Sequence, residues 1–332
     1  MQGLITHQAR TDRWPLWTSG LLLCGYLLLS LWSNRVGAET ARVLIVSGDS
    51  GGAYAEVIAT LQTRLNELAP DSVQLQTLNL ADAQGTFEKT LHPAPDLIVT
   101  VGTQASALAQ SKSENTPVLS LLVSAPDYAL LNQVNPSDSN LHSALYLDQP
   151  LDRQLTLLQL LLPKVTRLAS LSGPQSAEQT QQLRSLCVQR NLQLSIESVA
   201  PDSNPIRPLT RLIDHAEVLI ALPDPHVFNR SSIQAILLTT YRNRVPVIGF
   251  SQAYVRAGAL AAVHSTAQQI GQQAGEWIVE FTQSENRQLG PPRYPRYYSV
   301  AVNTQVAQSL NLSVSSENVL LHQLQQLENR SP

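Results

Sequence analysis

Short apolar runs alternate with helix-spaced apolar positions along most of the chain. Unbroken runs of aliphatic and β-branched residues predict buried strands at residues 42–46, 96–101, 117–123, 167–171, 218–222, 245–250, 259–263 and 297–302. Residues 73–80 and 192–199 alternate apolar with polar side chains, which predicts strands with one covered face. Unbroken apolar runs are typical of parallel strands that are covered on both faces. The pattern therefore predicts an α/β protein built on parallel sheets.

Helical spacing fills the intervals between these runs. Within residues 53–68, apolar side chains recur at the spacing of one helix face. Further helices are predicted at residues 105–110, 151–162, 177–189, 206–213, 231–242 and 266–281, and a short polar one after residue 315. Both halves of the chain share one order: strand, loop, helix, strand, helix, strand, helix, strand. The order predicts two doubly wound parallel-sheet lobes with a cleft between them.

The first 38 residues have the composition of an export signal. Arg10 and Arg13 precede an apolar run at residues 14–32, and residues 36–38 supply the small side chains that a signal peptidase reads. We expect cleavage after Ala38 and a mature protein in the periplasm. The alternative is an inner-membrane anchor formed by residues 14–32, because a membrane span needs only ~20 apolar residues.

Composition and charge argue against several classes of function. Removing residues 1–38 takes away three of 22 basic and one of 25 acidic residues, which leaves a formal charge of −5. The chain has no basic stripe interleaved with aromatic residues, so nucleic acid is not an expected partner. One cysteine, Cys187, remains after cleavage, and it cannot form an internal disulfide. We interpret Cys187 as a small apolar residue of a helix.

The loop after the first strand contains GDSGG, a sequence that surrounds the nucleophilic serine of chymotrypsin-like proteases. Their catalytic device needs a histidine base and an orienting carboxylate, both earlier in the chain than the serine. Here His7 is the sole histidine before Ser50, and it belongs to the export signal. We therefore expect no enzyme, with an exported serine hydrolase using Ser50 or Ser251 as an alternative. The glycines and the following helix N-terminus suit the binding of a carboxylate.

Polar residues follow the carboxyl ends of several predicted strands, where open α/β sheets bind their ligands. The predicted ligand-binding residues are Ser47, Ser50, Gly51, Tyr54, Gly102, Thr103, Gln104, Ser124, Asp224, Asn229, Ser251 and Tyr254. Several belong to types that also cap helices, so either role is open for each residue. We expect the anionic end of a small ligand to meet residues 50–52 or 102–103, and its ammonium or hydroxyl group to pair with Asp224.

No metal or cofactor site is predicted. Neither glycine loop matches the GxxxxGK[ST] or GxGxxG patterns of nucleotide-binding proteins. His215, Asp224 and His226 lie close together in the sequence, but their spacing matches no standard set of metal ligands. We therefore expect a protein that needs neither a cofactor nor a metal ion.

Several longer segments, taken in order, resemble one known family. They are DLIVTVGTQASALA (96–109), TPVLSLLVSAPDYALL (116–131), LDQPLDRQLTLLQLLLP (147–163), LASLSGP (168–174), EVLIALPDPHVFNRSSIQAILLTTYRNRVPVIGFSQAYVRAGALAAV (217–263) and QQIGQQAGEWI (268–278). Their order is similar to that of ABC-transporter substrate-binding proteins, in the group whose studied members bind tryptophan, tyrosine or phenylalanine. The resemblance implies a periplasmic-binding-protein fold of type I, in which three crossovers join two lobes that close on a ligand.

The resemblance also implies domain boundaries and partners. Lobe 1 would comprise residues 39–147 and 264–286, lobe 2 residues 148–263 and 287–314, and a polar tail residues 315–332. The protein would be a monomer that delivers a small polar or anionic solute, such as an amino acid, to an ABC permease and its ATPase in the inner membrane. The alternative is a ligand-sensing accessory of a membrane receptor or kinase.

Overall fold

The computed structural model describes residues 3, 40–81, 87–113, 115–134 and 141–329. The chain divides into two units, Met1–Thr40 and Ala41–Pro332, and the fold below is that of the second. The predicted cleavage site after Ala38 and the apolar run at residues 14–32 lie outside the described residues. Within the described ranges, every helix is too short or too polar to cross a lipid bilayer.

The first lobe is built on a parallel sheet whose five strands, counted over the described residues, run in the order β2-β1-β3-β4-β5. The strands are β1 (Ala41–Ser47), β2 (Val73–Asn79), β3 (Leu97–Val101), β4 (Val118–Val123) and β5 (His142–Tyr146). Apolar side chains of α2 (Gly52–Leu68) and α11 (Ala267–Gln283) cover one face. The other face packs against α3 (Phe87–Thr90), α4 (Thr103–Lys112) and α5 (Ala125–Val134).

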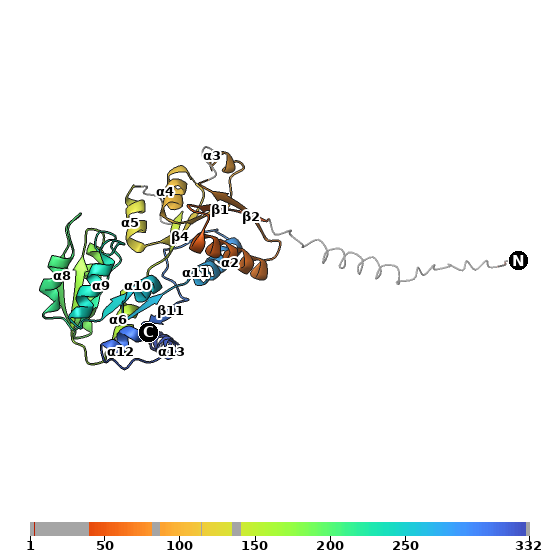
Figure 1. Ribbon diagram of the computed structural model, residues 1–332. Helices are drawn as coiled ribbons and strands as arrows, with labels where there is room; N and C mark the ends of the chain where they lie inside the picture. The colour runs from red at the N-terminus through yellow and green to blue at the C-terminus, as the bar shows by residue number, and fades with distance from the viewer. Residues whose placement is uncertain (1–2, 4–39, 82–86, 114, 135–140, 330–332) are drawn as a thin grey trace. The chain divides into compact units, whose positions relative to one another are not determined.

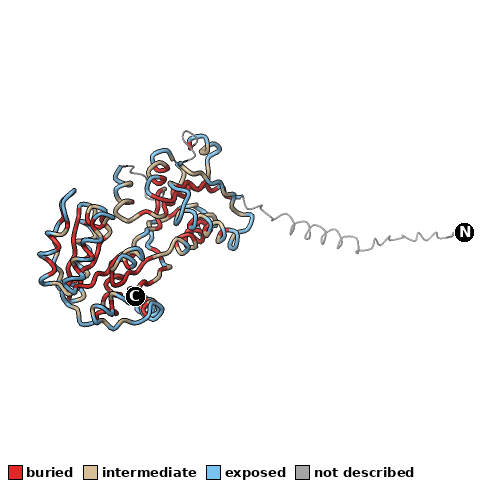
Figure 2. Tube along the Cα trace, viewed as in Figure 1, coloured by how far each residue is buried: buried red, intermediate tan, exposed pale blue. Residues whose placement is uncertain are grey.

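The second lobe is built on a sheet of six strands, again counted over the described residues, in the order β11-β10-β9-β8-β6-β7. The strands are β6 (Arg167–Ser172), β7 (Gln193–Ser198), β8 (Val218–Ile220), β9 (Val247–Gly249), β10 (Ala261–His264) and β11 (Ser299–Val302). Strand β11 runs antiparallel to β10, and the other neighbours pair in parallel. The inner strands of both sheets are largely buried, whereas the edge strands β2 and β7 are partly exposed (Figure 2).

Helices cover the second sheet on both faces. One core contains side chains of α6 (Leu151–Leu161), α7 (Ala177–Gln189), α12 (Thr304–Ser309) and α13 (Glu317–Glu328). Further apolar clusters contain side chains of α8 (Ile206–Ile213), α9 (Ile233–Arg242) and α10 (Gln252–Ala257). The prediction of two doubly wound α/β lobes is confirmed.

Five elements of the described residues were not predicted from the apolar pattern: α3, β5, α5, α10 and α12. Strand β5 begins with His142 and Ser143, so its apolar run is too short to be recognised, although both residues are buried. Helix α5 has Pro126 in its first turn, where proline is tolerated because the N–H groups there have no helical partner. The tail helix α13 was predicted as polar, but its Leu320 and Leu324 are buried in the second-lobe core.

Helix α11 returns from the second lobe to pack on α2, from which it is far away in the sequence (Figure 1). Two glycines permit the close approach. A Cβ atom on Gly271 would lie 2.5 Å from the carbonyl oxygen of Val57, and one on Gly275 would lie 2.9 Å from Cβ of Arg64. The helix begins with a capping box in which Thr266 and Gln269 satisfy each other's backbone N–H groups.

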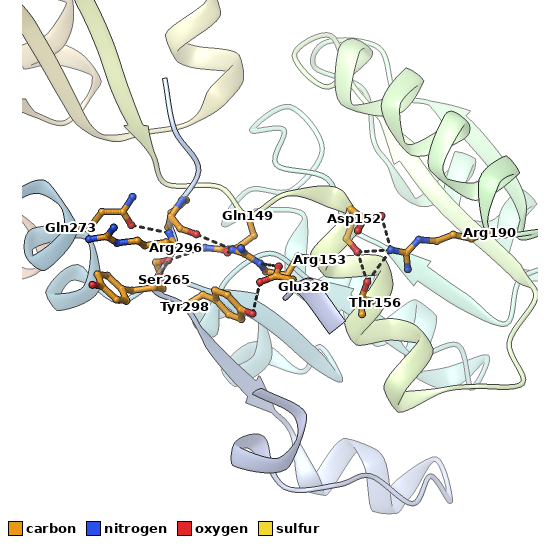
Figure 3. A network of polar contacts seen from close by, with 12 residues as sticks. Gln149, Asp152, Arg153, Thr156, Arg190, Ser265, Gln273, Arg296, Tyr298 and Glu328 are labelled. Atoms are coloured by element: carbon orange, nitrogen blue, oxygen red, sulfur yellow. Dashed lines mark hydrogen bonds and ion pairs between the residues drawn. The ribbon is translucent and has the colours of Figure 1, made fainter. Parts of the chain in front are cut away.

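Three crossovers join the lobes in the described part of the chain: residues 147–150, 265–266 and 284–298. A polar network links them (Figure 3). Arg153 donates to Oε1 of Gln149 at 2.5 Å and to the carbonyl oxygen of Pro295 at 2.9 Å. Its Nε also contacts Glu328 of α13 at 2.5 Å, so the C-terminal helix is tied to the crossovers.

Candidate functional site

A pocket of about 880 Å³ lies between the lobes, lined by residues from both. The first lobe contributes the start of α2 and of α5, and the second lobe contributes the loops after β8 and β9. Residues of the first two crossovers complete the wall. The pocket therefore lies outside the carboxyl ends of strands from both sheets, where open α/β folds bind ligands. Its volume is in the range of small-molecule sites.

Four of the predicted site residues line this pocket: Ser124, Asp224, Ser251 and Tyr254. Eight do not line it, namely Ser47, Ser50, Gly51, Tyr54, Gly102, Thr103, Gln104 and Asn229. Asn229 lines a separate pocket of about 460 Å³. Its Oδ1 accepts hydrogen bonds from the backbone N–H groups of Ser231 and Ser232 in the turn before α9.

Backbone N–H groups of the GDSGG loop form hydrogen bonds within the loop. Oδ1 of Asp49 accepts hydrogen bonds from the N–H of Ser50 at 2.6 Å and of Gly51 at 3.1 Å. The hydroxyl of Ser47 is buried and donates to the carbonyl oxygen of Asp49. The N–H groups of Ser50 and Gly51, two of those that we expected to bind a ligand carboxylate, are thus bonded within the loop, whereas Gly52 and Ala53 line the pocket.

Tyr54 covers the second glycine loop. A Cβ atom on Gly102 would lie 2.7 Å from the Tyr54 hydroxyl, and Gly102 has a φ of +92° that favours glycine. Thr103 and Gln104 follow at the exposed start of α4, outside the interlobe pocket. The structure therefore does not bring the Gly102 loop together with the pocket residues.

Two carboxylates lie together at the start of α5. Ser124 and Asp127 cap the helix reciprocally: the Ser124 hydroxyl donates to Oδ2 of Asp127 at 2.7 Å and accepts the Asp127 N–H at 3.1 Å. The neighbouring Asp148 accepts the Ala125 N–H at 2.5 Å. Removal from water raises the pKa of Asp148 to about 6, and the negative charge of Asp127 acts in the same direction.

Aromatic side chains form the second-lobe wall. Phe228, Phe250 and Tyr254 all line the pocket, and the ring centroids of Phe250 and Tyr254 are 4.3 Å apart. The Tyr254 hydroxyl donates to the carbonyl oxygen of Phe228 at 2.7 Å. Burial raises the pKa of Tyr254 to about 12, so the hydroxyl stays protonated and keeps this bond at neutral pH.

Asp224 holds the second-lobe loops together. Its Oδ2 accepts the N–H groups of Gln175 and Ser176 at 3.0 and 2.9 Å, and its Oδ1 accepts the His226 N–H at 2.9 Å. The side chain is fully buried, and a Cβ atom on Gly173 would lie 2.5 Å from Oδ2. Asp224 lines the pocket, but its oxygens are already bonded to three backbone donors.

The sequence analysis did not identify most of the charged residues that line the pocket. Glu56 is one turn into α2, four residues after Gly52, and this helical spacing is the signal that would have found it. Asp148 follows the unpredicted strand β5, so its place at a strand end was not visible. His264 and Thr266 flank the second crossover and line the pocket. Burial lowers the pKa of His264, which leaves the imidazole neutral at pH 7.

The lining is negatively charged. Of the described residues that line the pocket, four are carboxylates, Glu56, Asp127, Asp148 and Asp224, and none is a lysine or arginine. The described part of the chain holds no group of three or more His, Cys, Asp or Glu side chains placed to bind a metal ion. Ser50 is exposed, and no hydrogen bond joins it to a histidine in the described structure.

Comparison with known sequences gives one family-level match and a distant relative. The family model for "ABC transporter substrate binding protein" matches residues 70–326. A tyrosine-binding protein from Clostridioides difficile (strain R20291) is 20% identical over 247 residues, which cover 73% of this chain and 70% of the relative.

Solved structures share the fold. The ligand-free, open structure of a substrate-binding protein with adhesive properties from Clostridium difficile has a TM-score of 0.68 at 19% identity, covering 83% of this chain and 96% of that one. A Streptococcus pneumonia ABC domain in complex with L-Trp has a TM-score of 0.59 at 17% identity, covering 86% of this chain and 98% of that one. The predicted periplasmic-binding-protein fold of type I is confirmed.

Proposed function

Because the chain belongs to the family of ABC transporter substrate-binding proteins, we propose that it is the solute-binding component of an ABC uptake system. The observation that carries this proposal is the pocket of about 880 Å³ between the lobes. Its wall combines helix N-termini, carboxylates and aromatic rings, the mixture expected for a small polar ligand. The family assignment favours binding without turnover, so we propose no catalytic role for Ser50 or Ser251.

The two-lobe architecture suggests how a ligand is bound. Each has its own apolar core, and the three crossovers described above connect them. A ligand that contacts the first-lobe carboxylates and the second-lobe aromatic rings satisfies both sets only when the lobes are together. This difference in affinity shifts the population toward the closed form. The closed form would then be recognised by the permease, which couples to an ATPase.

Binding and delivery can be tested in two steps. A thermal-shift screen of amino acids, amines, sugars and carboxylates should identify a ligand that raises the melting temperature, because only the folded state binds it. Calorimetry should give one site, and Phe250→Ala should weaken binding while Phe87→Leu in the first-lobe core leaves it unchanged. A ligand that binds Phe250→Ala as tightly as wild type would contradict the interlobe site.

The transport role needs a second readout. In proteoliposomes that hold the proposed partner permease and its ATPase, the liganded protein should stimulate ATP hydrolysis. Ligand binding without any stimulation would favour the sensing alternative, a partner of a membrane receptor or kinase.

We also propose that residues 1–38 are a cleaved export signal and that the mature protein is periplasmic, as a monomer. Intact-mass measurement of protein from the periplasmic fraction should give a chain that begins at Glu39. A mass that retains residues 1–38, or recovery in the membrane fraction alone, would instead support the anchor formed by residues 14–32.

A further inference from the structure

We propose that the ligand of the interlobe pocket carries a net positive charge, as an ammonium or guanidinium group without a balancing carboxylate. This inference rests on the proposed solute-binding function and deepens it. It differs from the anionic ligand that the glycine loops predicted.

The first argument is the charge of the wall. Glu56, Asp127 and Asp148 come from three separate segments, namely α2, α5 and the first crossover, and all reach the same pocket. No lysine or arginine among the described lining residues balances them, and the nearby His264 is neutral at pH 7. A pocket lined in this way attracts cations and repels anions.

The second argument is the difference in hydrogen bonding among the carboxylates. Asp224 has three backbone N–H partners, so it is stabilised by its own loops. Among the described residues, Asp148 has a single N–H partner, Ala125, and it lies near the like charge of Asp127. A carboxylate has room for about four hydrogen bonds. The Asp127–Asp148 pair therefore has acceptor capacity that a cationic ligand group would fill.

The third argument is the opposite wall. The ring centroids of Phe228 and Phe250 are 6.3 Å apart, and the ring of Tyr254 packs against both. Aromatic faces attract ammonium and guanidinium groups through their quadrupole. The second lobe thus offers a surface for the same kind of ligand that the first-lobe carboxylates select.

Two other occupants fit less well. A ligand carboxylate would be placed near Asp127 and Asp148. Of the donors expected to receive it, the Ser50 and Gly51 N–H groups are bonded to Asp49, and residues 102–103 lie outside the pocket. A bare metal ion needs several ligands around one point, and no such group of side chains exists in the described residues. The geometry points to an organic cation.

The test uses matched probes that differ in charge and share a side chain. Tyramine, tyrosine and 3-(4-hydroxyphenyl)propanoate carry an ammonium, both groups, and a carboxylate respectively, while agmatine and arginine form a second pair. By calorimetry on the mature protein, we expect tyramine or agmatine to bind at least about tenfold more tightly than its carboxylate-bearing counterpart. The propanoate should not bind. Tighter binding of tyrosine, of arginine or of the propanoate would overturn the inference.

Variants assign the effect to the carboxylates. Asp127→Asn and Asp148→Asn should each weaken binding of the cationic probe by about ten- to a hundredfold, because each removes a charged hydrogen-bond acceptor. Glu280→Gln is the control: Glu280 pairs with Arg293 and does not line the pocket, so affinity should stay at the wild-type value. Wild-type affinity for the cationic probe in all three variants would refute the role of Asp127 and Asp148.

The outcomes separate this inference from the proposed function. If a neutral or anionic solute binds in the pocket and no cation does, the charge assignment fails and the solute-binding function stands. If no solute of any charge binds, both fail.

Discussion

Gln149 donates its side-chain N–H to Oγ of Ser265 across 2.8 Å, which joins the first crossover to the second. Ser265 in turn donates to the carbonyl oxygen of Tyr297, on the third crossover, at 2.6 Å. One chain of two hydrogen bonds thus spans all three connections between the lobes. Any rotation of one lobe against the other must preserve, bend or break it.

Ser265→Ala should remove both bonds at once. Because it leaves the Gln149 amide and the Tyr297 carbonyl without this partner, we expect the free energy of unfolding to fall by about 1–3 kcal/mol. Urea denaturation monitored by circular dichroism measures it. Ser111→Ala is the matched control, since the exposed Ser111 hydroxyl donates to the Leu108 carbonyl oxygen of its own helix. Equal stabilities for the two variants would mean that the hydrogen-bond chain does not constrain the crossovers.

Asp148→Asn should stabilise the unliganded protein at neutral pH. The folded-state pKa of Asp148 is about 6, above its ordinary 3.8, so the folded state holds this proton more tightly than the unfolded state. The wild-type contribution to stability is therefore full below pH 4 and is lost as the pH rises through 6. Asparagine cannot ionise and still accepts the Ala125 N–H, so we expect a gain of about 1–3 kcal/mol at pH 7.5.

The pH dependence makes that prediction specific. The gain should shrink toward zero below pH 4, where the Asp148 carboxyl group of the wild type is protonated in both the folded and the unfolded state. Asp127, Tyr146 and Tyr294, the titratable groups that interact with Asp148, are the same in both proteins. Denaturation curves collected from pH 4 to pH 8 test it, and a difference that does not change with pH would contradict the assignment to Asp148.

Gly271→Ala should destabilise the first lobe. The added Cβ atom would lie 2.5 Å from the carbonyl oxygen of Val57, so α11 and α2 must separate. Overpacking of this kind costs about 1–3 kcal/mol, more than the roughly 1 kcal/mol that alanine contributes inside a helix. Differential scanning calorimetry should show a lower melting temperature. Gly51→Ala, whose Cβ would meet its nearest atom at 3.9 Å, should be nearly neutral.

Asp224→Asn tests the structural role of the buried carboxylate. The asparagine side chain has one acceptor oxygen where the aspartate has two. At least one of the N–H groups of Gln175, Ser176 and His226 therefore loses its acceptor. We expect a loss of about 2–4 kcal/mol in the free energy of unfolding. Chemical denaturation measures the loss, and hydrogen exchange at residues 175 and 176 should accelerate with it. A wild-type exchange rate at these two amides would exclude the bracing role.

The strands could be predicted from the sequence because burial imposes long apolar runs such as residues 97–101. The pocket could be located at the strand ends by the same reasoning, and Ser124, Asp224, Ser251 and Tyr254 do line it. The bonding of these residues could not be foreseen. Whether a serine or aspartate caps a helix or faces a ligand depends on loops brought together by folding, as when Asp224 meets Gln175 and Ser176 from another strand end.

The position of α11 has a consequence for the order of biosynthesis. One face of the first sheet is complete only when Ile270, Ala274, Trp277 and Phe281 cover it, and these residues are made after the whole parallel part of the second sheet. At roughly 5–20 residues per second, several seconds pass between the end of β5 and the end of α11. During that interval the part of the first sheet that α11 covers is exposed, so we expect the nascent first lobe to need protection from aggregation.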